Sequence, residues 1–184
     1  MDHGADSYRR YLDGDENGFT EIVRDYKDGL ILYLNSFTGS LAAAEDLAED
    51  TFVRLGLRKP RFLGKATFKT WLYAAGRNAA IDYLRKNAGR GSVPLEECEE
   101  LADAQSLESA YLRQERRILL YGALKRLKAE YRQVLWLVYF EGFSQKEAAR
   151  IMRKGTHATE VLVSRARQAL KAELIREGFT DENL

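Results

Sequence analysis

The stretch from residue 143 to residue 170 constrains the fold more than any other part of this 184-residue chain. Ser144 and Glu147 have the spacing of a capping box, which predicts that a helix begins there. Gly155 interrupts the apolar periodicity and can adopt the left-handed conformation that a short turn between helices needs. A second helix is predicted over residues 157–177. Two helices joined in this way are typical of a helix-turn-helix, although a helical hairpin in any bundle shows the same pattern.

The second of these helices has two different faces. Its outward face is polar and partly basic, as suits a helix that enters a DNA major groove. The residues on that face are His157, Glu160, Val161, Ser164, Arg165 and Gln168. The opposite face is predicted to pack on the rest of the domain. It consists of Thr159, Leu162, Val163, Ala166 and Leu170.

Apolar residues recur at helical spacing almost throughout the chain, and no alternating run bounded by turn residues predicts a strand. Only two prolines occur, and neither lies inside a strongly periodic segment. The chain is therefore predicted to be all-α. The expected helices cover approximately residues 5–12, 16–38, 41–55, 68–87, 107–126, 129–141, 144–153 and 157–177.

The strongest break in this pattern lies between Lys86 and Pro94, where two glycines, a serine and a proline follow one another closely. The acidic stretch 95–106 has few side chains to bury and is typical of an exposed linker. We therefore predict two small helical domains joined by an acidic linker. The predicted boundaries are 1–88 for the first domain, 89–112 for the linker, 113–178 for the second domain and 179–184 for a tail.

Charge is distributed in blocks, although the formal net charge is only +1. Residues 54–90 hold 10 basic side chains and 1 acidic one, and residues 113–177 hold 15 and 7. An acidic stretch precedes each of these blocks. This distribution suits a protein with two separate polyanion-binding surfaces, although charge runs are often only solvated faces.

Composition argues against several classes of protein. The single cysteine, Cys98, allows no intramolecular disulfide framework and no cysteine-rich zinc site. The charged N-terminus shows no signal peptide, and no apolar run approaches the roughly 20 residues of a membrane span. We expect a soluble, cytoplasmic protein with no metal, no cofactor and no membrane insertion.

The predicted helix 41–55 carries four carboxylates on its outward face. They are Glu45, Asp46, Glu49 and Asp50. Because these charges repel one another, a cationic partner would relieve the repulsion. A solvated acidic face is the simpler alternative.

The segment 58–86 is a basic loop containing Phe62, followed by a helix with Phe68 and Trp71. Cations interleaved with aromatic rings suit single-stranded nucleic acid, because rings stack on unpaired bases and cations follow the phosphates. The alternative is that the rings belong to the core. Phe68 has the spacing of a core residue, and for Trp71 both interpretations stay open.

The order of these motifs resembles a bacterial RNA polymerase sigma factor of the extracytoplasmic-function (ECF) group of the sigma-70 family. The chain has an acidic Ala-Glu-Asp-Leu helix, a basic loop, and then Thr-Trp-Leu-Tyr-Ala-Ala-Gly-Arg-Asn-Ala-Ala-Ile-Asp-Tyr-Leu-Arg-Lys. A helix-turn-helix ending in Ser-Arg-Ala-Arg-Gln-Ala-Leu completes the order. The resemblance covers about residues 16–175. It implies a region 2 bundle that docks on core polymerase and melts the −10 element, and a region 4 domain that reads the −35 element.

The resemblance also implies partners and site residues. The partners would be core RNA polymerase, through the β′ clamp coiled coil and the β flap, promoter DNA, and an anti-sigma factor. The core-binding positions would be Asp46, Leu47, Glu49, Asp50 and Phe52. The −10 DNA positions would be Arg61, Phe62, Lys65, Thr67, Lys69, Trp71, Arg77, Asn78, Arg85 and Lys86. The −35 DNA positions would be His157, Thr159, Glu160, Val161, Ser164, Arg165 and Gln168.

The chain departs from the family pattern at two of these positions. Glu49 stands where glutamine is usual, and Glu160 stands where arginine is common. A glutamate can accept a hydrogen bond from cytosine N4, so Glu160 predicts an atypical −35 preference.

Other classes of function fit the sequence less well. The two histidines are isolated, no glycine-rich phosphate loop follows a strand, and the paired carboxylates are expected on the surface, so an enzyme is not predicted. A conventional helix-turn-helix regulator with a helical sensing or dimerisation domain is the main alternative. It would need neither the acidic helix nor the basic-aromatic loop. A helical adaptor with no DNA role is a third class.

Overall fold

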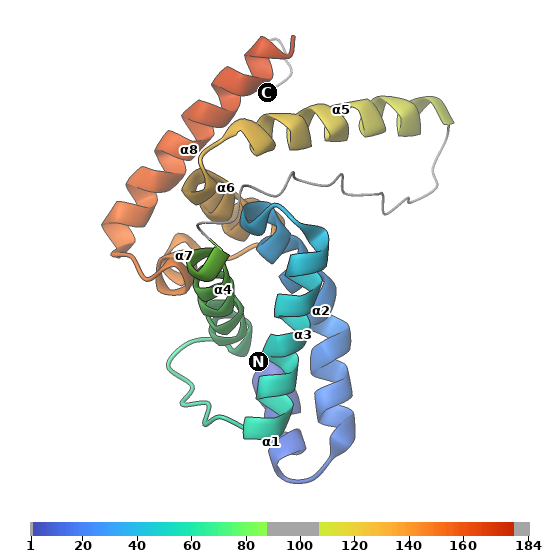
Figure 1. Ribbon diagram of the computed structural model, residues 1–184, viewed down its shortest axis with the longest axis vertical. Helices are drawn as coiled ribbons and strands as arrows, with labels where there is room; N and C mark the ends of the chain where they lie inside the picture. Colours follow the sequence, from blue (N-terminus) through green and yellow to red (C-terminus); the bar gives the residue numbers. More distant parts are fainter. Residues whose placement is uncertain (1, 88–106, 179–184) are drawn as a thin grey trace.

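The computed structural model describes residues 2–87 and 107–178, and every regular element in these ranges is helical (Figure 1). The all-α prediction is therefore confirmed. The α-helices are α1 (His3–Leu12), α2 (Glu16–Thr38), α3 (Leu41–Arg58), α4 (Phe68–Asn87), α5 (Leu107–Arg126), α6 (Ala129–Leu135), α7 (Gln145–Met152) and α8 (Thr156–Arg176), with a π-helix, η1 (Trp136–Phe140), after α6. No helix within the described ranges is long and apolar enough to cross a membrane.

Helices α2 and α3 run side by side and in opposite directions (Figure 1), because the connection between them is very short. Gly39 ends α2 in the left-handed conformation at a φ of 75°, and the Ser40 side chain caps the first turn of α3. Helix α3 runs to Arg58, three residues beyond the predicted end. It ends where Lys59 is left-handed and Pro60 follows, since the residue before a proline avoids the helical conformation.

The second half of the chain differs from the prediction in the middle of the expected helix 129–141. The α-helical pattern stops at Leu135, and the next turn is a π-helix closed by the Glu141 amide donating to the Trp136 carbonyl at 3.0 Å. In this turn the rings of Trp136 and Phe140 stack with centroids 4.4 Å apart. Apolar periodicity alone does not distinguish such a turn from a continuous α-helix.

The turn between α7 and α8 corrects one prediction and confirms another. Ser144 and Glu147 form the predicted capping box at the start of α7. The left-handed residue, however, is Arg153 at a φ of 54°, not Gly155. Gly155 is extended and serves as the N-cap of α8. The physical reason is that the Lys154 amide donates to the Ala149 carbonyl at 2.9 Å, and this helix-ending bond places Arg153, the residue before Lys154, in the left-handed conformation.

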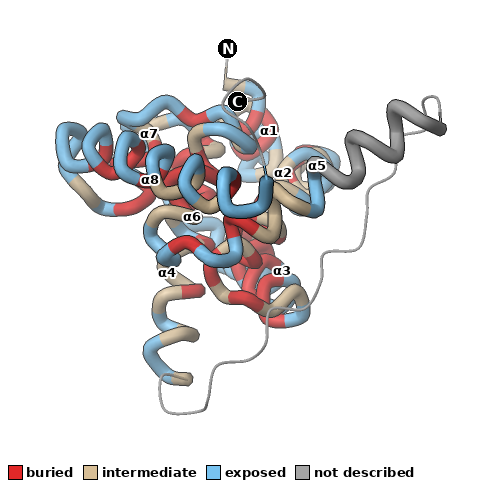
Figure 2. Tube along the Cα trace, turned by 90° about the horizontal axis from the view of Figure 1, so that it is seen from above, coloured by how far each residue is buried: buried red, intermediate tan, exposed pale blue. Residues whose placement is uncertain are grey.

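Buried side chains from the two halves of the chain form one continuous cluster. Figure 2 shows buried positions on helices of both halves. Tyr33 and Tyr73 stack in the first half, and Leu137 and Ile151 are fully buried in the second. The halves meet where α4 contacts α7 and α2 contacts α6. Residues 88–106, which include most of the predicted linker 89–112, and the predicted tail 179–184 lie outside the described residues, whereas 107–112 belongs to α5.

Candidate functional site

The acidic face of α3 borders a groove of about 770 Å³, which we call the acidic groove. Glu45, Asp46 and Glu49 line it, and Asp50 is exposed one residue further along α3. The rest of its lining is mainly apolar, with one cation, Lys27. The large apolar and aromatic members are Tyr11, Phe19, Val23, Phe52, Val53 and Leu57. Carboxylates beside exposed apolar surface suit a partner that presents both cations and apolar side chains.

The sequence analysis did not predict two of the apolar residues that line this groove. Val53 and Leu57 are 45% and 82% exposed, although both are large hydrophobic residues. They continue the row of Glu45 and Glu49 at four-residue spacing, so the sequence did contain the signal. Leu47, in contrast, is buried in the core and offers little surface to a partner.

The loop of residues 59–67, which joins α3 to α4, packs its half-buried aromatic ring against α4 and directs its cations outward. The ring of Phe62 lies 5.4 Å from that of Trp71 and 5.8 Å from that of Phe68. Arg61 and Lys65 are exposed. At the other end of α4, Arg85 and Lys86 are also exposed in the last turn. The cations predicted to meet −10 DNA at the two ends of this segment therefore reach solvent.

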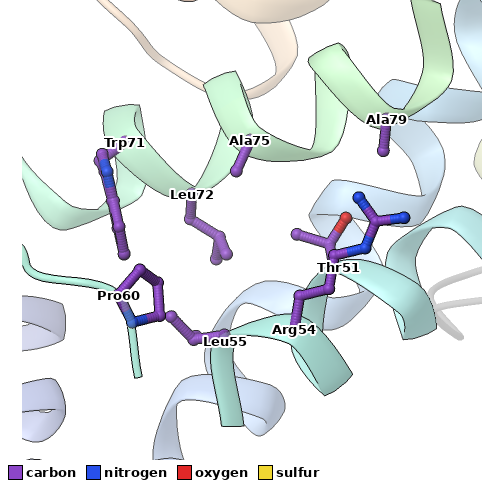
Figure 3. A pocket seen from close by; sticks show the side chains of 8 residues that line it. All are labelled: Thr51, Arg54, Leu55, Pro60, Trp71, Leu72, Ala75 and Ala79. Carbon is purple, nitrogen blue, oxygen red and sulfur yellow. The ribbon is translucent and has the colours of Figure 1, made fainter. Parts of the chain in front are cut away.

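A small pocket of about 120 Å³ lies between α3 and α4. Figure 3 shows Trp71 and Pro60 near one end and the Arg54 side chain reaching toward Ala79 at the other. Its lining is apolar apart from Thr51, Arg54 and the ring nitrogen of Trp71. The pocket thus combines an aromatic wall with one cation, and sequence reasoning had not placed Arg54 there.

Six of the seven residues predicted to read −35 DNA are exposed on α8. They are His157, Glu160, Val161, Ser164, Arg165 and Gln168. The seventh, Thr159, is fully buried, and its hydroxyl donates to the Gly155 carbonyl at 3.1 Å. Thr159 therefore belongs to the packing face of α8, and the prediction that it contacts DNA is not supported by its position.

Glu141, which follows η1, is held against α4. Its carboxylate accepts a hydrogen bond from the Tyr73 hydroxyl at 2.6 Å and pairs with the Lys69 ammonium at 3.0 Å. Lys69 also donates to the Glu141 carbonyl at 2.8 Å. Burial, together with the adjacent Glu141 carboxylate, raises the pKa of Tyr73 well above its usual value. The hydroxyl therefore remains a hydrogen-bond donor throughout the physiological pH range.

Glu147 of α7 makes a second contact between the second half of the chain and the start of α4. Its carboxylate accepts hydrogen bonds from the hydroxyls of Thr70 and Thr67 at 3.2 and 3.4 Å. Partial burial raises the pKa of Glu147, but the hydrogen bonds from Ser144, Thr70 and Thr67 outweigh it and hold the pKa below its usual value. The carboxylate is therefore ionised at neutral pH, and this contact weakens only as the pH falls through that lowered pKa.

Two arginine contacts extend this interface. The Arg77 Nε donates to the Gln133 side-chain oxygen at 3.0 Å, and Arg150 donates to the Lys65 carbonyl at 2.9 Å. The second half of the chain therefore contacts four residues that were predicted to bind −10 DNA. They are Lys65, Thr67, Lys69 and Arg77.

Within the described residues, no group of three or more His, Cys, Asp or Glu side chains is placed to hold a metal ion. The candidate site consists of three surfaces: the acidic groove, the loop with α4, and the exposed face of α8.

Comparison with known proteins decides the family. Residues 22–90 match the model described as Sigma-70 region 2, and residues 117–170 match that described as Sigma-70, region 4. The ECF RNA polymerase sigma factor SigM of Bacillus subtilis (strain 168) is 32% identical over 162 residues, which are 88% of this chain and 98% of that protein. This chain belongs to the ECF sigma factors. The RNA polymerase sigma-H factor of Pseudomonas aeruginosa is also similar, at 28% identity over 170 residues and 88% of both chains.

Two solved structures share the fold of this sigma factor. The sigma factor RpoE from Bartonella quintana, in complex with the anti-sigma factor NepR, has a TM-score of 0.68 and 25% identity, covering 85% of this chain and 96% of that one. CnrH, in complex with the cytosolic domain of CnrY, has a TM-score of 0.63 and 24% identity over 95% and 96% of the two chains. The region 2 match spans most of α2 and all of α3 and α4, and the region 4 match runs from the end of α5 into α8. Helix α1 lies outside both.

Proposed function

We propose that this ECF sigma factor docks on core RNA polymerase with its acidic groove, captures −10 DNA with the loop 59–67 and α4, and reads −35 DNA with α8. The observation that carries the proposal is the acidic groove. A conventional helix-turn-helix regulator would not need carboxylates beside the exposed side chains of Val53 and Leu57 to bind DNA. As a member of its family, the chain binds core RNA polymerase and directs promoter-specific transcription initiation. We assign no catalytic role to any of its residues.

The partner of the acidic groove would be the coiled coil of the β′ subunit. Asp46, Glu49 and Asp50 would pair with its cations at the rim, and Val53 and Leu57 would cover its apolar side chains. Phe52 would contribute from the wall of the groove. Such a combination gives orientation through charge and affinity through apolar burial.

The surface for −10 DNA would be assembled from the loop and the outer face of α4. Arg61, Lys65, Arg85 and Lys86 would follow the phosphates, while Phe62 and Trp71 would stack on an unpaired base. The remaining positions of this surface are Thr67, Lys69, Arg77 and Asn78. The pocket beside Trp71 would accept a base flipped from the stack, at a cost of a few kcal/mol that contacts in the pocket offset.

Four of these residues contact the second half of the chain, so capture of −10 DNA requires α4 and α7 to separate. We propose that docking on polymerase or DNA selects this open arrangement. The domain boundaries predicted at residues 88 and 113 would allow it, because the connection between the halves is long. An anti-sigma factor would instead favour the closed arrangement. The similar structure of RpoE, which is in complex with the anti-sigma factor NepR, supports a partner of this kind. The region 4 domain would also contact the β flap.

The proposal is tested by transcription with sigma-free core polymerase on a library of genomic fragments. Initiation at specific sites that depends on this chain is the expected result. Binding to duplex DNA without polymerase, together with no initiation on any template, would instead favour the conventional helix-turn-helix regulator.

Exchange of Glu160 for glutamine should relax the preference at one −35 base pair. Its carboxylate is about half exposed on α8 and lies 3.6 Å from the His157 Nδ1, so it is positioned to accept from a cytosine amino group. The expected loss of discrimination is about 1–3 kcal/mol at that position. A promoter library measures it, with Glu130→Gln on α6 as the matched control. If the base preference is unchanged at every −35 position, Glu160 does not read a base.

A further inference from the structure

Helix α1 and its N-cap Asp2 precede both matched regions, yet their side chains contact the backbone at or beside the two ends of the loop 59–67. The contacts are hydrogen bonds in which Tyr8 and Tyr11 donate and Asp2 accepts. They connect the N-terminus of the chain to the segment that the proposed function assigns to −10 DNA.

The far end of the loop is held by Asp2. Its Oδ2 accepts a hydrogen bond from the Phe68 amide, the first in α4, at 2.7 Å. Its Oδ1 accepts from the Ala5 amide at 3.2 Å and so caps α1 as well. One carboxylate thus satisfies the N-terminal turns of two helices, where negative charge is favoured.

The near end of the loop is held by two tyrosines. The Tyr8 hydroxyl donates to the Pro60 carbonyl at 2.8 Å, and the Tyr11 hydroxyl donates to the Gly56 carbonyl at 2.8 Å. The Lys59 ammonium lies 4.5 Å from the centroid of the Tyr11 ring, where a cation–π contact favours the left-handed Lys59. The end of α3 and the start of the loop are therefore both tied to α1.

Packing fixes α1 in this place. The Tyr8 ring is buried, with its centroid 5.3 Å from that of Phe68 and 5.8 Å from that of Trp71. A Cβ at Gly4 would lie 2.6 Å from the Phe68 ring and 2.5 Å from the Tyr26 hydroxyl, so the helix approaches α4 as closely as only glycine allows.

We infer that α1 positions the −10 loop, with Asp2 and Tyr8 as positioning residues that themselves touch no DNA. By restraining both ends of the loop, α1 reduces the conformational entropy that would be lost when Phe62 and its neighbours close on an unpaired base. A loop held in this way discriminates between bases better than a free one. The inference rests on the proposed function of the loop.

The test measures initiation by the full-length chain with core polymerase on libraries randomised at either promoter element. Asp2→Ala and Tyr8→Phe should each lower discrimination between −10 bases on the order of three- to tenfold, as expected when one well-placed hydrogen bond is lost. Asp2→Asn keeps one acceptor oxygen and should have an intermediate effect. Preferences at −35 and affinity for core polymerase should not change. Asp13→Ala, at the other end of α1, and Tyr139→Phe, exposed in η1, are the matched controls.

The variant Phe62→Ala distinguishes a failure of the inference about α1 from a failure of the proposed function of the loop. If Phe62→Ala and the α1 variants alter discrimination at the same −10 positions, the inference is supported. If only Phe62→Ala does so, or if the α1 variants lower initiation equally on all templates in step with a lower melting temperature, the inference is wrong and the proposed function stands. If Phe62→Ala alters no −10 preference, the role of the loop fails and the inference with it.

Discussion

Replacing both Asp46 and Asp50 with lysine should weaken binding to core RNA polymerase by at least about 100-fold, or roughly 3 kcal/mol. Both carboxylates are exposed on the acidic face of α3, so the substitutions cost the fold little. The large effect comes from like charges placed against a cationic partner, since such juxtaposition costs several kcal/mol, whereas neutralising one exposed pair costs only about 0.2–1 kcal/mol.

The measurement is a binding titration of fluorescently labelled sigma factor with core polymerase at two salt concentrations. The matched control is the double variant Asp13→Lys and Asp28→Lys, which changes the net charge equally at exposed positions outside the acidic groove. An unchanged melting temperature shows that the fold is intact. Equal affinity of the two double variants would refute the docking surface proposed for α3.

Substitution of Glu141 by alanine should open the protein and increase the affinity of free sigma factor for single-stranded −10 DNA by roughly 10- to 100-fold. The Glu141 carboxylate is only 11% exposed and is the shared partner of Lys69 and Tyr73. Loss of a hydrogen-bonded, charged partner of this kind costs about 1.5–3 kcal/mol. This cost destabilises only the closed arrangement, in which Glu141 contacts α4. The released Lys69 then becomes available to DNA.

Glu130→Ala is the control for this variant, because it also removes one negative charge and one ion pair. Its partner, Lys154, lies in the same half of the chain, so the contact with α4 is untouched. Small-angle scattering should show a larger radius of gyration for Glu141→Ala only. A radius and a DNA affinity equal to those of Glu130→Ala would mean that Glu141 does not hold the two halves together.

Much of the fold could be predicted from the sequence because helices are specified locally. The capping box of Ser144 and Glu147 depends on residues three positions apart, and the structure contains it. The acidic face on α3 and the polar face on α8 follow from the same periodicity. The family assignment is confirmed as well, since it depended on the order of these local motifs.

The predictions failed where backbone conformation and packing decide the structure, because the spacing of residue types does not show either of them. Arg153, not Gly155, is left-handed, because the backbone bond from Lys154 to Ala149 ends α7 at that position. Thr159 is buried, as its place on the predicted packing face requires, so its position disagrees only with the DNA contact that the family resemblance implied. Leu47, which the resemblance placed in the contact with polymerase, is also buried. The π-turn at Trp136 has the same apolar spacing as an α-helix, so no periodicity could reveal it.

The sequence alone determined that this protein is all-α, that it carries an acidic helix, a basic-aromatic loop and a helix-turn-helix, and that it resembles an ECF sigma factor. These are properties of residues close together in the chain. Only the tertiary structure decided that Glu141 meets Tyr73 and that Asp2 caps α4, because these pairs are 68 and 66 residues apart. Such contacts depend on how helices pack, and packing is set by the shapes and charges of whole surfaces, which local periodicity does not encode.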